Sequence, residues 1–395
     1  MLQSLSHWNE EESGGDMKKN WGILLLGLGL VLGCESKQKP VDAANWSGQM
    51  QNMSQDIKLL IPFLYDKKSY SAKENEEKIS RALDDLKSQS HRVPEKMGEK
   101  FLGDDPILSF SLNNLQSDLS RAASSFKAGH KEYSRSVMKS SIGHCFRCHS
   151  LTTIGSEAQW DLSDFNQLEI NSEEKLDLMI AARKYKEAYH FVEKEITRPG
   201  IVDQSPMRFE GLLRKHLALS LRLNEKPQVA LDNLNRVLEN KKLPPYLEKQ
   251  VKAWRDSLKG WTHFKKKGDL VQLAEARIAK ALKLQEFSYD HAGDVEYIWA
   301  TDLLHESLLK KQDPRKEAKA YYLLGRAYEV LDDLGSYGLH EAYYEACIKR
   351  SPKSKIARRC YDRFESSLKM GFSGSAGLTL PKEERKKLDE LKEYL

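Results

Sequence analysis

The stretch "KEYSRSVMKSSIGHCFRCHS", residues 131–150, joins a helical apolar pattern to two closely spaced cysteines and a histidine. Its apolar residues include Val137, Met138 and Ile142, of which Met138 and Ile142 have the four-residue spacing of one helix face. Cys145, Cys148 and His149 follow at the end of the pattern. The chain has only 5 cysteines, so this grouping indicates a chemical role: zinc binding, thiol redox chemistry or covalent attachment of haem.

The segment from Cys145 to His149 matches C-x-x-C-H, the motif that attaches haem covalently. Two thiols one helical turn apart can bond to one edge of the porphyrin, and the adjacent histidine then becomes an axial iron ligand. A structural zinc site needs a second ligand pair, and Cys347 and Cys360 lie far along the chain. A thioredoxin-type motif follows a strand, whereas the flanks here are helical. The sequence therefore predicts one covalent haem c, with His149 as iron ligand.

Composition and periodicity favour an all-α protein. Of the 395 residues 40% are hydrophobic and 31% charged, and few stretches alternate as strands do. The formal net charge of +5 is small for this length, so nucleic acid is not a predicted partner. No Ser/His/Asp order, phosphate loop or H-E-x-x-H motif is present. The sequence thus favours a carrier or binding protein over an enzyme.

The segment "MKKNWGILLLGLGLVLGC", residues 17–34, is typical of an export signal. Two lysines precede an apolar run that is shorter than the ~20 residues needed to span a bilayer. Val31-Leu32-Gly33-Cys34 resembles a bacterial lipobox, in which the cysteine is lipidated and becomes the mature N-terminus. Leucine is commoner where Val31 stands, and a plain secretory signal or an uncleaved anchor is the alternative.

This interpretation places most of the chain outside the cytoplasm. The acidic residues 1–16 are unsuited to a signal peptide, so we expect translation to begin at Met17, and residues 1–34 to comprise an over-called start and the signal. Residues 35–44 are then a polar tether. We expect a protein anchored through Cys34 at the periplasmic face of a bacterial membrane, with inner and outer membrane both open.

Residues 45–155 are predicted to form four helices, spanning about 45–65, 71–91, 106–129 and 131 to the motif. Four helices with the haem motif at the end of the last resemble the cytochrome c′ family, as does "ALDDLKSQSHRVP" (82–94) in the second helix. The resemblance covers less than a third of the chain. It implies a four-helix bundle that holds the haem.

In an up-down-up-down bundle, the end of the fourth helix lies beside the start of the first and the end of the second. Met50, Met53 and His91 would therefore lie at the haem end. Low-spin members of the c′ family take a methionine from early in the first helix, so the resemblance implies Met50 as the second axial ligand. Met53 and His91 are alternatives, and so is an open site, as in the members that bind small gases.

Residues 172–370 read as successive helical hairpins, clearest at "AKAYYLLGRAYEVL" (318–331) and in the segment 339–368. Small residues such as Gly325 and Ala342, followed by aromatic residues, resemble tetratricopeptide repeats. The resemblance implies a stacked solenoid whose concave surface docks a protein partner; an irregular helical domain is the alternative. Residues 371–395 are expected to form a flexible joint and a terminal helix.

Cys347 and Cys360 are a candidate disulfide. They lie on the two predicted helices of one hairpin, which turns at Ser351 and Pro352. An exported chain would meet oxidising conditions that allow the bond. Buried thiols are the alternative.

Together these features favour a lipid-anchored, mono-haem c-type cytochrome that carries electrons and docks a protein partner, such as a redox complex, through its helical repeats. Two alternatives use the same residues. The haem could sense gas or redox state and alter what the repeats bind, or the chain could be an assembly or scaffold lipoprotein with a structural haem.

Replacing the lipidation candidate tests the anchor. Cys34→Ala removes the thiol that would carry diacylglycerol, so the exported protein should move from the membrane fraction to the soluble periplasmic fraction. Fractionation followed by immunoblotting measures this. A variant that stays with the membrane would contradict lipidation at Cys34.

Overall fold

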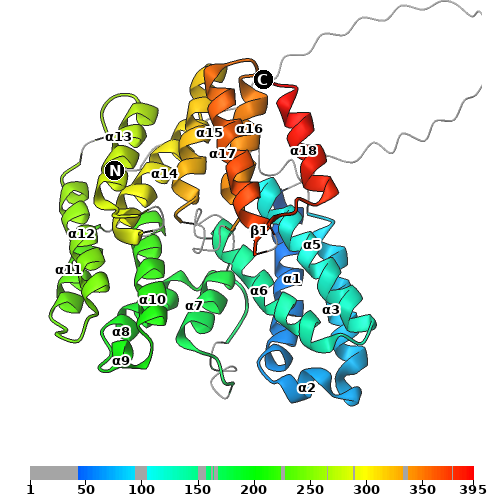
Figure 1. Ribbon diagram of the computed structural model, residues 1–395. Helices are drawn as coiled ribbons and strands as arrows, with labels where there is room; N and C mark the ends of the chain where they lie inside the picture. Colours follow the sequence, from blue (N-terminus) through cyan, green and yellow to red (C-terminus); the bar gives the residue numbers. More distant parts are fainter. Residues whose placement is uncertain are drawn as a thin grey trace, which may run out of the picture. The chain divides into compact units, whose positions relative to one another are not determined.

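The computed structural model describes residues 43–93, 105–149, 157–161, 163, 168–223, 227–264, 266–287, 290–331, 337–375 and 377–395, with backbone alone at 43–47 and 146–148. The expected signal peptide, Cys34 and the tether through residue 42 lie outside these residues. Residues 41–395 form one compact unit. The described part is almost entirely helical, which confirms the all-α prediction (Figure 1).

Four long helices share the first hydrophobic core: α1 (Ala43–Leu64), α3 (Glu76–Ser90), α5 (Ile107–Lys127) and α6 (Lys131–His149). Helix α1 packs on α3, α3 on α5, and α5 on α6. Their buried residues recur every three or four positions, as Met53, Ile57, Leu60 and Leu64 do on α1. The predicted ranges of the first, third and fourth helices therefore agree closely with the structure.

The second predicted helix begins differently from the prediction. Asp66 accepts hydrogen bonds from the backbone N–H groups of Lys68 and Ser69, and a short helix α2 (Lys67–Ser71) starts there. Ala72 is extended, and a 3₁₀ turn η1 (Lys73–Asn75) leads into α3. The predicted start of the second helix at residue 71 is therefore wrong, because Ser71 ends the short helix that Asp66 caps and the long helix begins at Glu76.

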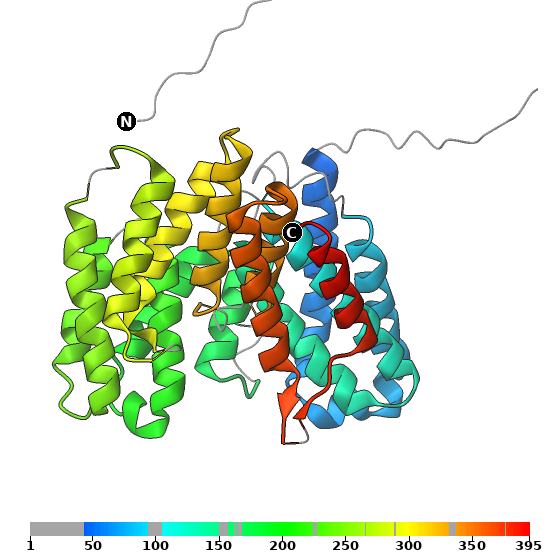
Figure 2. The same cartoon turned by 45° about the horizontal axis from the view of Figure 1, so that its top comes forward.

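The second hydrophobic core is built by the helices that follow, most of them packed against a neighbour in sequence (Figures 1 and 2). These elements are α7 (Ser172–Ala181), α8 (Tyr185–Ile196), α9 (Ile201–Gln204), α10 (Pro206–Ala218), the π-helical η3 (Leu219–Leu223), α11 (Pro227–Leu238), α12 (Pro245–Thr262), α13 (Leu270–Leu284), η4 (His291–Gly293), α14 (Asp294–Leu308), α15 (Pro314–Tyr328), α16 (Leu339–Arg350), α17 (Lys355–Gly371) and α18 (Lys382–Lys392). Helix α18 packs against α16 and α17.

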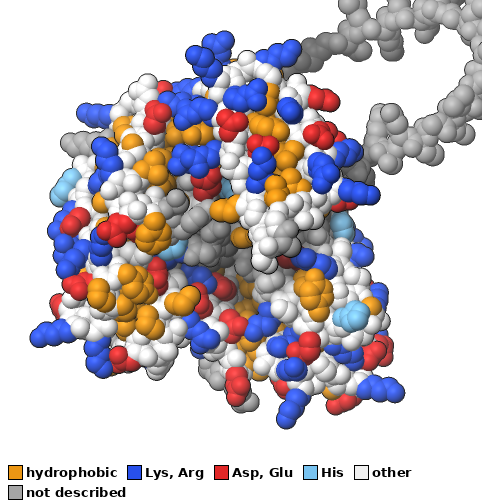
Figure 3. All heavy atoms as spheres, viewed as in Figure 1, with side chains coloured by type: hydrophobic (Ala, Val, Ile, Leu, Met, Phe, Trp, Pro, Cys, Tyr) orange, Lys and Arg blue, Asp and Glu red, His pale blue; other side chains and the backbone are white. Residues whose placement is uncertain are grey.

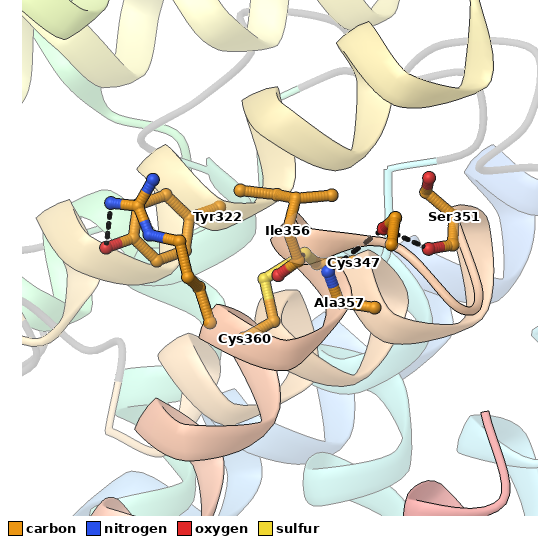
Figure 4. The surroundings of a disulfide bond; sticks show 8 residues. Tyr322, Cys347, Ser351, Ile356, Ala357 and Cys360 are labelled. Atoms are coloured by element: carbon orange, nitrogen blue, oxygen red, sulfur yellow. Dashed lines mark hydrogen bonds between the residues drawn. A yellow bond between two sulfur atoms is a disulfide. The ribbon is translucent and has the colours of Figure 1, made fainter. Parts of the chain in front are cut away.

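The hairpin of α16 and α17 is covalently closed. Cys347 and Cys360 form a disulfide between the two helices, with Cα atoms 6.3 Å apart (Figure 4). Beyond α17, strands β1 (Ser373–Gly374) and β2 (Gly377–Leu378) pair antiparallel. The segment expected to be a flexible joint thus contains a short β-hairpin.

Helix α7 contributes to both cores. Leu178 and Ala182 belong to the first core, whereas Leu176, Met179 and Ile180 belong to the second. Residues on opposite sides of this one helix are therefore buried against different sets of helices. The segments predicted as haem domain and repeat domain meet at α7.

Asp105, just before α5, makes a second connection between the cores. Its Oδ2 lies 2.6 Å from His305 Nδ1 on α14, and its Oδ1 accepts a 2.7 Å hydrogen bond from the Tyr343 hydroxyl on α16. The other ring nitrogen of His305 lies 2.9 Å from the Tyr328 hydroxyl. Burial alone would lower the pKa of His305, but Tyr328 and Asp105 together raise this pKa to about 10.

The face shown in Figure 3 carries Lys and Arg side chains interspersed with Asp and Glu and with apolar side chains. Among the helices that the structure describes, none has both the length and the apolar character needed to cross a membrane.

Gly325 tests the close approach of α15 to α16. A Cβ at this position would overlap the Tyr344 ring, so Gly325→Ala should lower the free energy of unfolding by about 1–3 kcal/mol. Gly260, also within a helix, has nothing within 4 Å of an added Cβ. Gly260→Ala should therefore raise that energy by about 0.5–1 kcal/mol. Urea unfolding measures the free energy of unfolding of both variants. Equal changes in the two variants would contradict the close packing of α15 on α16.

The Asp105–His305 pair predicts a pH dependence of stability. Because the pKa of His305 is raised from 6.5 to about 10, its contribution is full below about pH 6.5 and is lost as pH rises toward 10. Asp105→Asn should flatten this alkaline decline and lower the free energy of unfolding by on the order of 3 kcal/mol.

The control for this variant is an exposed ion pair. Asp203 lies 2.8 Å from Lys242 with both side chains about half exposed or more. Asp203→Asn should cost under about 1 kcal/mol and leave the pH profile intact. Denaturant unfolding between pH 6 and 10 compares the two variants, and parallel profiles for Asp105→Asn and wild type would refute the role of Asp105.

Candidate functional site

The cysteine motif occupies the C-terminal end of α6. Ser134, Met138 and Ser141 form a buried stripe along this helix, and Cys145, which is half-buried, follows in the same register. The backbone position of Cys148 continues that register, while its side chain lies outside the described residues. Both cysteines therefore occupy helix positions on the face that, further back, contacts the first core.

His149, the last residue of α6, contacts α7. Its Nδ1 lies 3.2 Å from the carbonyl oxygen of Ile180. Because a carbonyl oxygen only accepts, this contact assigns the proton to Nδ1. The lone pair is then on Nε2, the nitrogen that would coordinate a metal.

The turn between α7 and α8 surrounds the end of α6. Tyr185, the first residue of α8, donates a 2.9 Å hydrogen bond from its hydroxyl to the carbonyl oxygen of His149. Arg183 donates to the same hydroxyl at 3.0 Å, and its φ of 58° places it in the left-handed region. The Ala182 carbonyl accepts from the N–H of Ala158, in the chain after the motif.

Burial determines the protonation of these groups. Burial and, to a lesser extent, the positive charge of Arg183 together lower the pKa of His149 to about 3, against the carbonyl contacts at Ile180 and Ala181. Burial raises the pKa of Tyr185 to about 12, against the effect of Arg183. His149 is therefore neutral at pH 7, as a metal-binding imidazole must be.

Residues 157–160 connect this region to the start of α1. Gln51 donates from its amide to the Glu157 carbonyl at 3.1 Å, and the Trp160 indole donates to the Ser54 carbonyl at 3.0 Å. Ala158 and Trp160 are buried in the first core. The early part of α1 and the end of α7 are thus joined through one short segment.

The three candidates for a second axial ligand differ in burial. Met53 is 4% exposed within the first core, and Met50, one turn earlier, is half-buried against it. His91 is exposed at the C-terminal cap of α3. That end of α3 lies beside the early part of α1, where Gln89 donates to Asp56 at 2.9 Å. His144 instead pairs with Asp118 of α5 at 2.8 Å.

A cavity of about 360 Å³ lies along α6 and α7, before the motif in sequence. Arg135, Lys139, Glu174 and Asp177 contribute to its lining, and Lys139 pairs with Glu174 at 2.6 Å. Charged walls of this kind do not suit a mostly apolar macrocycle.

The residues present fit a covalent haem on three grounds. One thiol of the motif continues a buried stripe, His149 is neutral, and its Nδ1 proton is bound by a carbonyl, which leaves Nε2 for coordination. Among the described side chains, no group of three or more His, Cys, Asp or Glu residues is arranged to hold a metal ion.

No protein-family model, curated protein or solved structure matches the chain. The motif residues were found from the sequence, but their partners at Ile180 and Tyr185 were not. Ile180 acts through its backbone carbonyl, for which no residue type is a signal. Tyr185 lies 36 residues from His149 in sequence, and no motif in the sequence links the two.

Proposed function

We propose that this chain is an exported, lipid-anchored c-type cytochrome with one haem c attached to Cys145 and Cys148. The observation that carries the proposal is the C-x-x-C-H motif at the end of α6, with the His149 imidazole oriented by the Ile180 carbonyl. His149 would bind the iron through Nε2. When bound, a haem of this type supplies one-electron redox chemistry whose potential depends on its axial ligands.

The proposed architecture is a c′-like four-helix bundle followed by a solenoid of stacked hairpins similar to tetratricopeptide repeats. The common core of α1, α3, α5 and α6, with the motif at the end of the last, supports the bundle. The contact of Gly325 with the Tyr344 ring supports the repeats, because small residues there let paired helices approach closely. A protein partner, such as a redox complex, would dock on the repeats.

We propose Met50 as the second axial ligand. It continues the buried stripe of Met53, Ile57 and Leu60 toward the end of α1 that is bonded to residues 157–160. Met53 is buried in the core, and His91 is exposed at the end of α3, so Met50 is the candidate that is partly accessible and still packed against the core. Methionine–histidine ligation raises the potential and suits electron transfer at the periplasmic face of the membrane.

Optical spectra of protein made with a cytochrome c maturation system test this proposal. We expect covalent haem that survives denaturation, a low-spin ferric spectrum and a long-wavelength methionine–iron band. Cys145→Ala and Cys148→Ala should each weaken covalent attachment, and His144→Gln, next to the motif, should retain it. Met50→Ala should abolish the methionine band, whereas Met53→Ala should keep it.

Two outcomes would change the conclusion. A wild-type protein without covalent haem would refute the cytochrome proposal. A ferrous form that binds carbon monoxide at once would refute Met50 ligation and favour the gas-sensing alternative instead.

A further inference from the structure

We propose that the turn between α7 and α8 positions His149 and thereby sets the midpoint potential of the haem. This inference rests on the proposed function and adds a way in which the potential of the haem is controlled. The elements that hold the histidine belong to the first hairpin of the repeat region, so the structure assigns that hairpin a direct influence on the redox centre.

Two contacts hold His149 from different sides. The Ile180 carbonyl accepts from the ring Nδ1 at 3.2 Å, and the Tyr185 hydroxyl donates to the backbone carbonyl at 2.9 Å. His149 ends α6, where backbone carbonyls have no partner within the helix. Tyr185 therefore caps α6 at the residue whose side chain would bind the iron.

The direction of the Tyr185 hydrogen bond follows from Arg183. A guanidinium can only donate, and Arg183 Nη1 lies 3.0 Å from the Tyr185 hydroxyl oxygen. The hydroxyl oxygen accepts that bond, so its own proton is directed to the His149 carbonyl. Loss of either side chain should loosen the end of α6.

The Ile180 carbonyl is itself held in place. Ile180 is fully buried in the second core, and its carbonyl also accepts from the Arg183 N–H at 2.9 Å. Lys184 bonds back to the Met179 carbonyl at 2.9 Å, which closes the turn. The acceptor that faces His149 is therefore fixed by packing on α7, and its position moves only if the hairpin moves.

The chemical consequence concerns the electron density of the imidazole. A hydrogen bond from the other ring nitrogen to a carbonyl makes a ligating histidine more basic, which favours the ferric state and lowers the potential. Displacing the α7–α8 turn should weaken that bond and raise the potential. Any binding event that shifts the first hairpin would act on the haem in this way.

Tyr185→Phe in the full-length, haem-loaded protein is the test. This substitution removes the hydroxyl that donates to His149. The control is Tyr189→Phe, which removes a hydroxyl one turn further along α8, where the Tyr189 ring stacks on His216. Spectroelectrochemical titration should show a higher midpoint potential for Tyr185→Phe than for wild type. The expected difference corresponds to a several-fold increase in the equilibrium constant for haem reduction. A tenfold change corresponds to 59 mV for one electron. Tyr189→Phe should match wild type.

Arg183→Gly is a second variant, and glycine suits the left-handed backbone conformation at this position. Glycine adopts the left-handed conformation readily, so the turn is kept while the donor to Tyr185 is lost. Because Arg183→Gly also removes a positive charge near His149, and that loss by itself lowers the potential, we expect a smaller shift than in Tyr185→Phe, with a melting temperature near that of Tyr189→Phe. Equal potentials in Tyr185→Phe, Tyr189→Phe and wild type, all with covalent haem, would overturn this inference alone. A wild type without haem would overturn the proposed function as well.

Discussion

The burial of α7 on two sides constrains the rest of the described chain. Leu178 and Ala182 need the first core, whereas Leu176 and Ile180 need the second, and a helix that is apolar on opposite sides is stable only between two layers. Described residues between α6 and α7 are bonded both to the end of α7 and to α1. Ala158 donates to the Ala182 carbonyl after α7, and Trp160 donates to the Ser54 carbonyl of α1.

Buried charges give the second core its specific arrangement. Arg214 and Asp294 are both almost fully buried and lie 2.5 Å apart, and Glu296, two residues further along α14, pairs with Lys280. A charge removed from water is tolerated only when a partner of opposite sign lies close to it. These ion pairs fix the position of α14 against its neighbours. The contact between His305 of α14 and Asp105 likewise fixes the start of α5 against α14.

The sequence-based predictions were correct where the structure depends on residues close together in the chain. The ranges of α1, α5 and α6 agree with prediction because apolar residues repeat along each helix. The hairpin turn after Arg350 was predicted because Pro352 marks it, and the structure brings Cys347 and Cys360 together across that turn. The start of the second helix was predicted wrongly because Asp66 and Ser71 are both plausible caps, and only the backbone geometry at Ala72 distinguishes them.

The sequence by itself determined the helical class, the position of the cysteine motif at the end of a helix and the short set of candidate ligands. Each of these depends on residue type and spacing within one segment. Tertiary structure alone decided that Ile180 and Tyr185 hold His149, that Met53 is buried while His91 is exposed, and that one helix serves two cores. The physical reason is that a backbone carbonyl is the same in every residue, so its partner depends on how distant segments pack.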